Sequence, residues 1–266
     1  QYPQQTAQES QQLQVMKLLQ IALPVVVTFV FQNNLGLVVS GLIVGSYIAA
    51  LTYRLPRKIS IAQGRSVCDF CKKKISWFDN IPVLSYVLLG GKCRNCHKKI
   101  SLRYPAIELA TAIGFMGIGY YAMTFKGGSL QGLQGWWELP YLLTVFSILV
   151  AIFVIDLEHQ LIPDNLVFFL LVITYSLLLI TSASDFYVRA ASGFAAALFL
   201  LFIHLITRGR GMGLGDVKFA LLGGTILGFP NTLVFLFLSF LTGAGVGIIL
   251  ILTKRAKFGK PIPFGP

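Results

Sequence analysis

The chain has 266 residues, of which 55% are hydrophobic and 12% are charged, with a mean hydropathy of +0.73 and a formal net charge of +12. This composition excludes a soluble globular domain and a disordered chain. It predicts an all-α polytopic membrane protein, because each helical span needs about 20 mostly apolar residues.

The N-terminal region divides into two segments. Residues 1–14 are rich in glutamine and are predicted to be a disordered or expression-derived tail. Residues 15–34 are apolar but short, and Gln32-Asn33-Asn34 interrupts them. This second segment fits a membrane segment, an interfacial helix or a remnant of the tail. The first clear transmembrane helix is predicted at 35–55.

Apolar stretches of helical length recur through the rest of the chain. About seven transmembrane helices are predicted, near Gly36–Tyr53, Tyr104–Met123, Leu139–Ile155, Leu166–Thr181, Val188–Ile206, Val217–Phe229 and Thr232–Thr253. Phe229-Pro230-Asn231 predicts a turn between the last two, although one kinked helix is an alternative.

Basic residues concentrate between the first two spans. Residues 54–103 hold 12 of the 22 Lys and Arg residues and only two acids, Asp69 and Asp79. By the positive-inside rule this loop faces the cytoplasm. Alternating the spans then places Asp156 and Asp216 at the cytoplasmic membrane boundary. Residues 56–103 are predicted to form a small cytoplasmic domain.

The four cysteines of the chain lie in this loop as two CxxC pairs, Cys68/Cys71 and Cys93/Cys96. Such pairs are typical of a structural Zn²⁺ site with four thiolates, and a zinc-stapled domain is the interpretation adopted. A disulfide-linked or buried set is the alternative, which a reducing cytosol disfavours. The surrounding aromatic and basic residues would also suit nucleic acid. No nucleic-acid partner is expected, because membrane orientation and anionic lipids already explain the basic excess.

Two aspartates border apolar spans, where a carboxylate is costly and indicates function. Asp216 closes Gly213-Leu214-Gly215-Asp216, where it could serve as an N-cap. The glycines at 211, 213 and 215 favour close approach of another helix or a substrate. Asp156 ends its apolar run, where the helix dipole disfavours a negative charge. Capping therefore does not explain Asp156.

Two carboxylates that share a proton can activate water to cleave a peptide bond. Asp156 and Asp216 are the predicted catalytic pair, with Gly213, Gly215 and Lys218 in the active-site loop. Asp164 is a second-rank candidate, because Ile162-Pro163-Asp164-Asn165 reads as a turn that opens the next helix.

Several stretches together resemble the type IV prepilin peptidases, also called leader peptidase/N-methyltransferases, within the GxGD intramembrane aspartyl proteases. The likeness covers about residues 36–266, and it rests on Val44-Gly45-Ser46, Tyr53–Pro56, Trp77–Tyr86 between the CxxC pairs, Ile100–Ala110, Asp156–Asp164, Gly213–Lys218 and Pro261–Pro266. The chain departs from the family at Ala49, where relatives often have Asn. In relatives the last motif opens one more helix, so an eighth is expected after Pro266.

The resemblance implies a bacterial cytoplasmic-membrane enzyme that removes the basic leader from prepilins and pseudopilins of pili or type II secretion. It implies N-methylation of the new N-terminus by S-adenosylmethionine, and no site for that cofactor is recognised in the sequence. It also implies that Asp156 and Asp216 are the protease pair, that residues 104–266 form the protease domain, and that the cysteine loop belongs to methylation. The oligomeric state is left open.

Two other classes of function fit parts of the sequence. A membrane-tethered zinc module that binds nucleic acid or protein would need the cysteine loop but not the aspartates. A proton-coupled transporter would use the aspartates as a relay.

Overall fold

The computed structural model describes residues 34–60, 66–124, 137–181, 183–209 and 212–252. Within these ranges the regular elements are helices, and the only β pairing consists of two isolated bridges. The all-α prediction is therefore confirmed. The predictions for residues 1–14 and 15–33, for Gly211 and for the motif Pro261–Pro266 lie outside the described residues.

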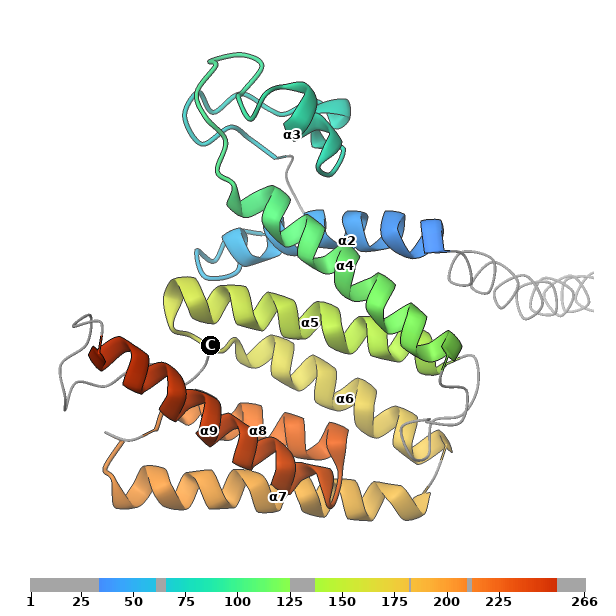
Figure 1. Cartoon of the computed structure of the whole chain (residues 1–266), viewed down its shortest axis with the longest axis vertical. Helices are drawn as coiled ribbons and strands as arrows, with labels where there is room; N and C mark the ends of the chain where they lie inside the picture. The colour runs from blue at the N-terminus through green and yellow to red at the C-terminus, as the bar shows by residue number, and fades with distance from the viewer. Residues whose placement is uncertain (1–33, 61–65, 125–136, 182, 210–211, 253–266) are drawn as a thin grey trace, which may run out of the picture. The chain divides into compact units, whose positions relative to one another are not determined.

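Each predicted span coincides with a helix (Figure 1). The elements are α2 (Asn34–Arg54), the 3-10 helix η1 (Trp77–Asn80), α3 (Leu84–Leu88), α4 (Arg103–Thr124), α5 (Glu138–His159), α6 (Asp164–Thr181), α7 (Ala183–Ile206), α8 (Leu214–Leu227) and α9 (Asn231–Leu252). The predicted turn between the last two helices is confirmed. Among the described helices, α2, α5, α6 and the Asp185–Ile206 part of α7 are long and apolar enough to cross a membrane. The count of seven spans stays a prediction.

The chain divides into two compact units. One unit includes residues 34–49, the cysteine loop and α4. Here α2 crosses α4 at close range (Figure 1), since a Cβ added to Gly45 would lie 2.7 Å from the Cα of Glu108. The predicted domain boundaries stay predictions.

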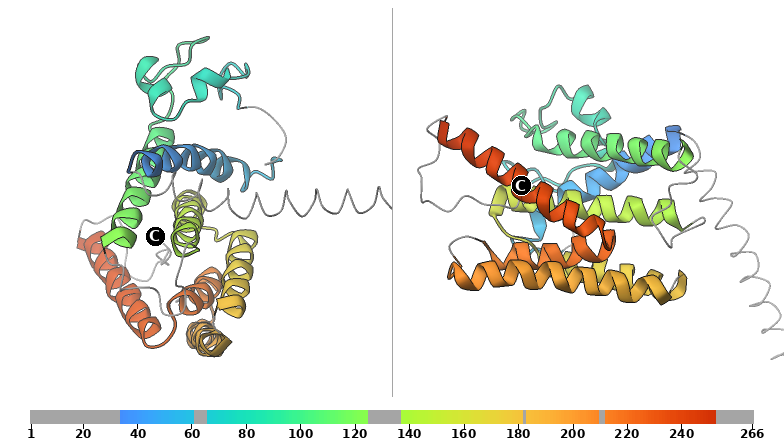
Figure 2. Two further views of the ribbon diagram at one scale, coloured as in Figure 1. Left: turned by 90° about the vertical axis from the view of Figure 1, so that its right-hand side faces the viewer. Right: turned by 60° about the horizontal axis from the view of Figure 1, so that its bottom comes forward.

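The second unit includes α5 from Val145 onward and α6 to α9. Its most extensive helix contact joins α7 and α8, which lie side by side in Figures 1 and 2. A Cβ on Gly224 of α8 would lie 2.8 Å from the Cα of Gly193 on α7. On the α6 side, the Tyr175 hydroxyl hydrogen bonds to the Thr225 hydroxyl at 3.2 Å. Small residues on α8 thus let two neighbouring helices hold it closely.

Helix α8 has 14 residues, so its length is about 21 Å, shorter than a hydrocarbon core of about 30 Å. Its C-terminal carbonyls are met by side chains: Arg189 donates to the Ile226 carbonyl, and the Thr232 hydroxyl bonds to Gly224 O at 3.3 Å. These bonds replace those that water would otherwise supply. The protein itself therefore supports the short helix at this end.

We expect Gly224→Ala to destabilise the protein by about 1–3 kcal/mol, because the new methyl group would meet the backbone of α7, including Ser192 O at 2.9 Å. Gly245→Ala in α9 is the matched control, since no atom lies within 4 Å of its added Cβ. Thermal unfolding in detergent measures both variants. Equal melting temperatures for the two would contradict the close packing of α7 on α8.

Candidate functional site

The segment between α7 and α8 is tied to α7 by a histidine. His204 Nδ1 hydrogen bonds to the Met212 carbonyl at 2.7 Å. At the end of α7, the N–H of Gly209, with φ of +75°, donates to the His204 carbonyl at 2.8 Å. This closure is a common helix C-cap arrangement. The residues directly before α8 are thus fixed from the α7 side.

Asp216 lies in the first turn of α8 and is not its N-cap, which is Gly213. The alternative that Asp216 is the N-cap is therefore wrong in position. Its Oδ2 accepts the Gly213 N–H at 3.0 Å, so the carboxylate satisfies an end donor from inside the helix. Because glycine has no side chain, this single bond is the whole of the capping interaction. The half-buried Asp216 side chain thus bonds the start of its own helix from the first turn.

Asp156 lies in the last turn of α5, as the sequence predicted, and its side chain is buried, with 7% exposure. Its Oδ2 is buried and accepts no hydrogen bond from the residues that the structure describes. A buried acceptor without a donor costs about 1–3 kcal/mol, and more when it is charged. This site therefore has a polar group that its own fold leaves unsatisfied.

Both aspartates line one cavity of about 140 Å³ in the second unit. The rest of the lining is mainly apolar, from α5, α7, α8 and α9, and includes Ile152, Phe219 and Phe240. The cavity has room for several water molecules. The structure thus brings the predicted pair together in a space that admits water.

The two glycines of the predicted active-site loop have different surroundings. A Cβ on Gly215 would lie 3.2 Å from Cδ1 of Ile162, in the turn between α5 and α6. A Cβ on Gly213 would lie 3.4 Å from Asp216 Oδ2 and would meet no other helix. Gly215 therefore permits close packing, whereas Gly213 leaves one side of the carboxylate open.

Asp164 and Lys218 are brought together with each other but do not line the cavity. Lys218 Nζ lies 2.5 Å from Asp164 Oδ1, with side chains 44% and 52% exposed. The pair joins the start of α6 to the first turns of α8. This placement favours Asp156 over Asp164 as the partner of Asp216.

The four cysteines form one cluster whose sulfur atoms all lie within 4.8 Å of one another. Cys68 Sγ and Cys96 Sγ are 3.8 Å apart, which excludes a disulfide between them, and the four thiols are free. Sulfurs bound tetrahedrally to a metal at about 2.3 Å are separated by about 3.8 Å. The cluster therefore has the dimensions of a metal site.

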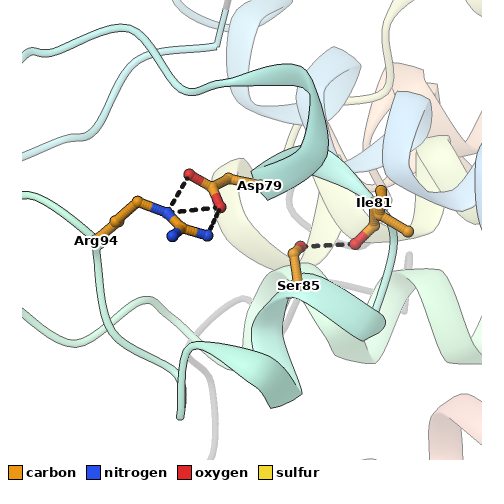
Figure 3. A network of polar contacts seen from close by, with 4 residues as sticks. All are labelled: Asp79, Ile81, Ser85 and Arg94. Atoms are coloured by element: carbon orange, nitrogen blue, oxygen red, sulfur yellow. Dashed lines mark hydrogen bonds and ion pairs between the residues drawn. The ribbon is translucent and has the colours of Figure 1, made fainter.

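Each cysteine pair lies in a short turn closed by a β-bridge, and we call residues 67–74 the first hook and residues 92–99 the second hook. The two hooks have the same backbone conformation. The bridges Val67–Lys74 and Lys92–Lys99 close them, and Cys68 N–H to Lys73 O (3.0 Å) corresponds to Cys93 N–H to Lys98 O (2.9 Å). Lys72 and His97 take positive φ at equivalent positions, +57° and +54°. Neither position is a glycine or an asparagine, so no residue type in the sequence signals this left-handed backbone conformation. Within the second hook, Arg94 donates hydrogen bonds to both carboxylate oxygens of Asp79 on η1 (Figure 3).

Two polar residues of structural importance were missed in the sequence. His204 holds Met212, and Glu108 of α4 is buried and accepts the Val83 N–H at 2.8 Å. A polar residue within an apolar span was the available signal for each.

Comparisons with known proteins agree with this arrangement. A family model described as the bacterial peptidase A24 N-terminal domain matches residues 39–122, and one described as the type IV leader peptidase family matches residues 143–248. No solved structure matches the chain.

Among curated proteins, several relatives carry the name prepilin leader peptidase/N-methyltransferase. The Bacillus subtilis protein is 35% identical over 86% of this chain and 88% of its own length. The Pseudomonas aeruginosa protein is 33% identical over 85% and 83%, and the Aeromonas hydrophila protein is 39% identical over 76% and 67%. The chain is therefore a multi-pass membrane protein that belongs to the prepilin leader peptidase/N-methyltransferase family.

Proposed function

We propose that this chain cleaves the leader of type IV prepilins and pseudopilins at the cytoplasmic face of the bacterial inner membrane. The observation that carries the proposal is the cavity shared by Asp156 and Asp216. Relatives named for this reaction support the substrate class. The basic excess of residues 54–103 supports the cytoplasmic side.

In this mechanism the two carboxyl groups share one proton, so one acts as base and the other as acid. The ionised group takes a proton from water, and the water oxygen bonds to the carbonyl carbon of the scissile peptide. The protonated group donates its proton to the carbonyl oxygen. Collapse of the tetrahedral intermediate breaks the C–N bond, and the amine leaves with a proton from a carboxyl group. The Gly213 N–H holds Asp216 Oδ2 during these steps.

The apolar lining supports this chemistry in two ways. It keeps bulk water away from the cavity, so the two carboxyl groups interact strongly. The apolar lining can also contact the apolar residues on either side of the scissile bond of an extended peptide. The buried Asp156 Oδ2, which lacks a donor among the described residues, is available to water or substrate.

Asp156→Asn and Asp216→Asn are each expected to lower leader cleavage by at least about 10²–10⁴-fold, because an amide cannot exchange the required proton. Cleavage of a model prepilin in detergent or liposomes, followed by mass spectrometry, measures the effect. Both variants should insert and melt like the parent protein. Robust cleavage by either one would remove that residue from the catalytic pair.

The Asp164–Lys218 ion pair is proposed to position the first turns of α8, and with them Asp216. Lys218→Met should slow cleavage while changing stability by less than about 1 kcal/mol, because the pair is exposed. Exchange of the two residues, D164K with K218D, should restore part of the rate.

Asp164→Asn should retain measurable cleavage, unlike Asp156→Asn. An inactive Asp164→Asn enzyme that is equally stable would return Asp164 to the catalytic candidates.

We also propose that Cys68, Cys71, Cys93 and Cys96 hold one structural Zn²⁺. Four thiolates leave no open coordination position, and the sulfur spacing fits the ion. Hydrogen bonding from the Cys71 backbone lowers the pKa of the Cys68 thiol to about 7. At Cys96 the hydrogen bond from the Lys98 backbone is outweighed by desolvation and the neighbouring thiols, which raise the pKa to about 11, so metal binding would have to displace a proton there. Bound zinc would cross-link the two hooks.

Elemental analysis of the purified protein should find about one zinc per chain. Metal removal should expose four thiols to alkylation and make residues 66–102 sensitive to protease, because this module has little apolar core. A metal-free protein with four reactive thiols and an intact module would contradict the assignment.

Methylation of the new N-terminus is the second activity proposed, with S-adenosylmethionine as donor, on the strength of the relatives' names. Residues 56–103 are proposed to support this step and residues 104–266 to contain the protease. After incubation with S-adenosylmethionine, the mass of the cleaved product should exceed that of the product made without it by one methyl group.

A further inference from the structure

The short helix α3 carries apolar side chains that the protein does not cover. Leu84, Val87 and Leu88 are 52%, 66% and 76% exposed. At 100° per residue these three side chains fall within an arc of about 100° on one face of the helix. The opposite face packs inward, because the Tyr86 ring lies over Gly91 at the start of the second cysteine hook. Leu84, Val87 and Leu88 therefore form an exposed apolar stripe on the face of α3 opposite to the one that packs on the second hook.

The start of α3 is fixed at a defined depth by α4. Glu108 Oε2 accepts the Val83 N–H at 2.8 Å, and the Ser46 side chain of α2 also bonds to Glu108. Glu108 lies five residues after the first residue of α4, Arg103, which is about 7.5 Å along the helix axis. Arg103, stacked on the Tyr104 ring, is the type of residue pair found at a membrane interface. The tether therefore joins the start of α3 to α4 close to this basic and aromatic helix end.

The backbone at this tether is strained. Val83 has φ of +57°, and the Leu84 N–H bonds to Pro82 O in a tight three-residue turn. A β-branched residue rarely adopts this conformation, so surrounding contacts must impose it. The buried carboxylate of Glu108 is such a contact. The chain therefore bends sharply at Val83, directly before α3 begins, and Glu108 holds this bend against α4.

The surface beside α3 carries positive charge. Arg94 is engaged with Asp79 of η1, whereas Lys92, Lys98 and Lys99 of the second hook are exposed. Trp77 of η1, which packs against α3, is 74% exposed. Leucine, tryptophan and lysine exposed together are typical of a helix that lies in the interface of an anionic bilayer.

We propose that α3 and Trp77 form an interfacial anchor that docks the cysteine module on anionic lipid headgroups, with Leu84, Val87 and Leu88 inserted at the acyl boundary. The Glu108–Val83 hydrogen bond sets the depth of the anchor. Docking covers apolar surface that would otherwise face water, and it keeps the metal module at the membrane surface.

The test places a tryptophan reporter on the stripe. Leu88→Trp is made in a chain whose three native tryptophans are phenylalanine (W77F, W136F, W137F), and the full chain is placed in nanodiscs of phosphatidylcholine with phosphatidylglycerol. Lipids brominated on the upper acyl chain should quench this reporter several-fold more strongly than iodide does. Lys73→Trp in the same background, on the exposed part of the first hook, should show the reverse order. The readout requires no catalytic turnover.

Strong iodide quenching of the Leu88→Trp reporter would overturn the proposal by placing the stripe in water. Protection from both quenchers would overturn it in favour of a protein partner, such as another part of this chain or a second copy. Equal bromolipid quenching in nanodiscs without phosphatidylglycerol would overturn the requirement for anionic lipid. Glu108→Ala should increase iodide access to the reporter, and unchanged access would overturn the role of the tether.

Discussion

The constraint on which the second unit depends is the burial of the Asp156 carboxyl group in an apolar helix. Hydrocarbon and packed side chains cannot solvate a carboxylate, so the group needs water, a proton or a polar partner. The described part of the chain gives Oδ2 no donor and instead places Asp216 on the same cavity. A carboxyl group that is costly for stability therefore lies where the proposed cleavage needs it.

The short helix α8 makes this meeting possible. A helix that ends within the protein exposes its terminal backbone groups, and here neighbouring side chains receive them. Arg189 and Thr232 bond its C-terminal carbonyls, and Asp216 bonds Gly213 at its start. Close packing at Gly224 then fixes the helix laterally against α7. The position of Asp216 thus results from contacts along the whole of α8.

The first unit uses different means of stabilisation. Among residues 66–102 only Cys93 is both hydrophobic and buried, so an apolar core contributes little to this module. The Arg94–Asp79 ion pair, the Glu108 tether and the proposed metal cross-link between the two hooks take that role. Apolar residues that would form a core in a soluble domain are left on its surface, where a membrane can cover them.

The sequence by itself determined the helices, the cysteine pairs and the family. These features depend on local composition and short spacing: apolar runs of span length, two residues between cysteines, and proline and asparagine after Phe229. The tertiary structure decided what required contacts between distant residues. It placed Asp216 at the third position of α8 instead of the cap, paired Asp164 with Lys218, and assigned His204 and Glu108 to backbone groups far along the chain. A hydrogen bond across many residues leaves no periodic signal, because either partner alone is only an isolated polar residue.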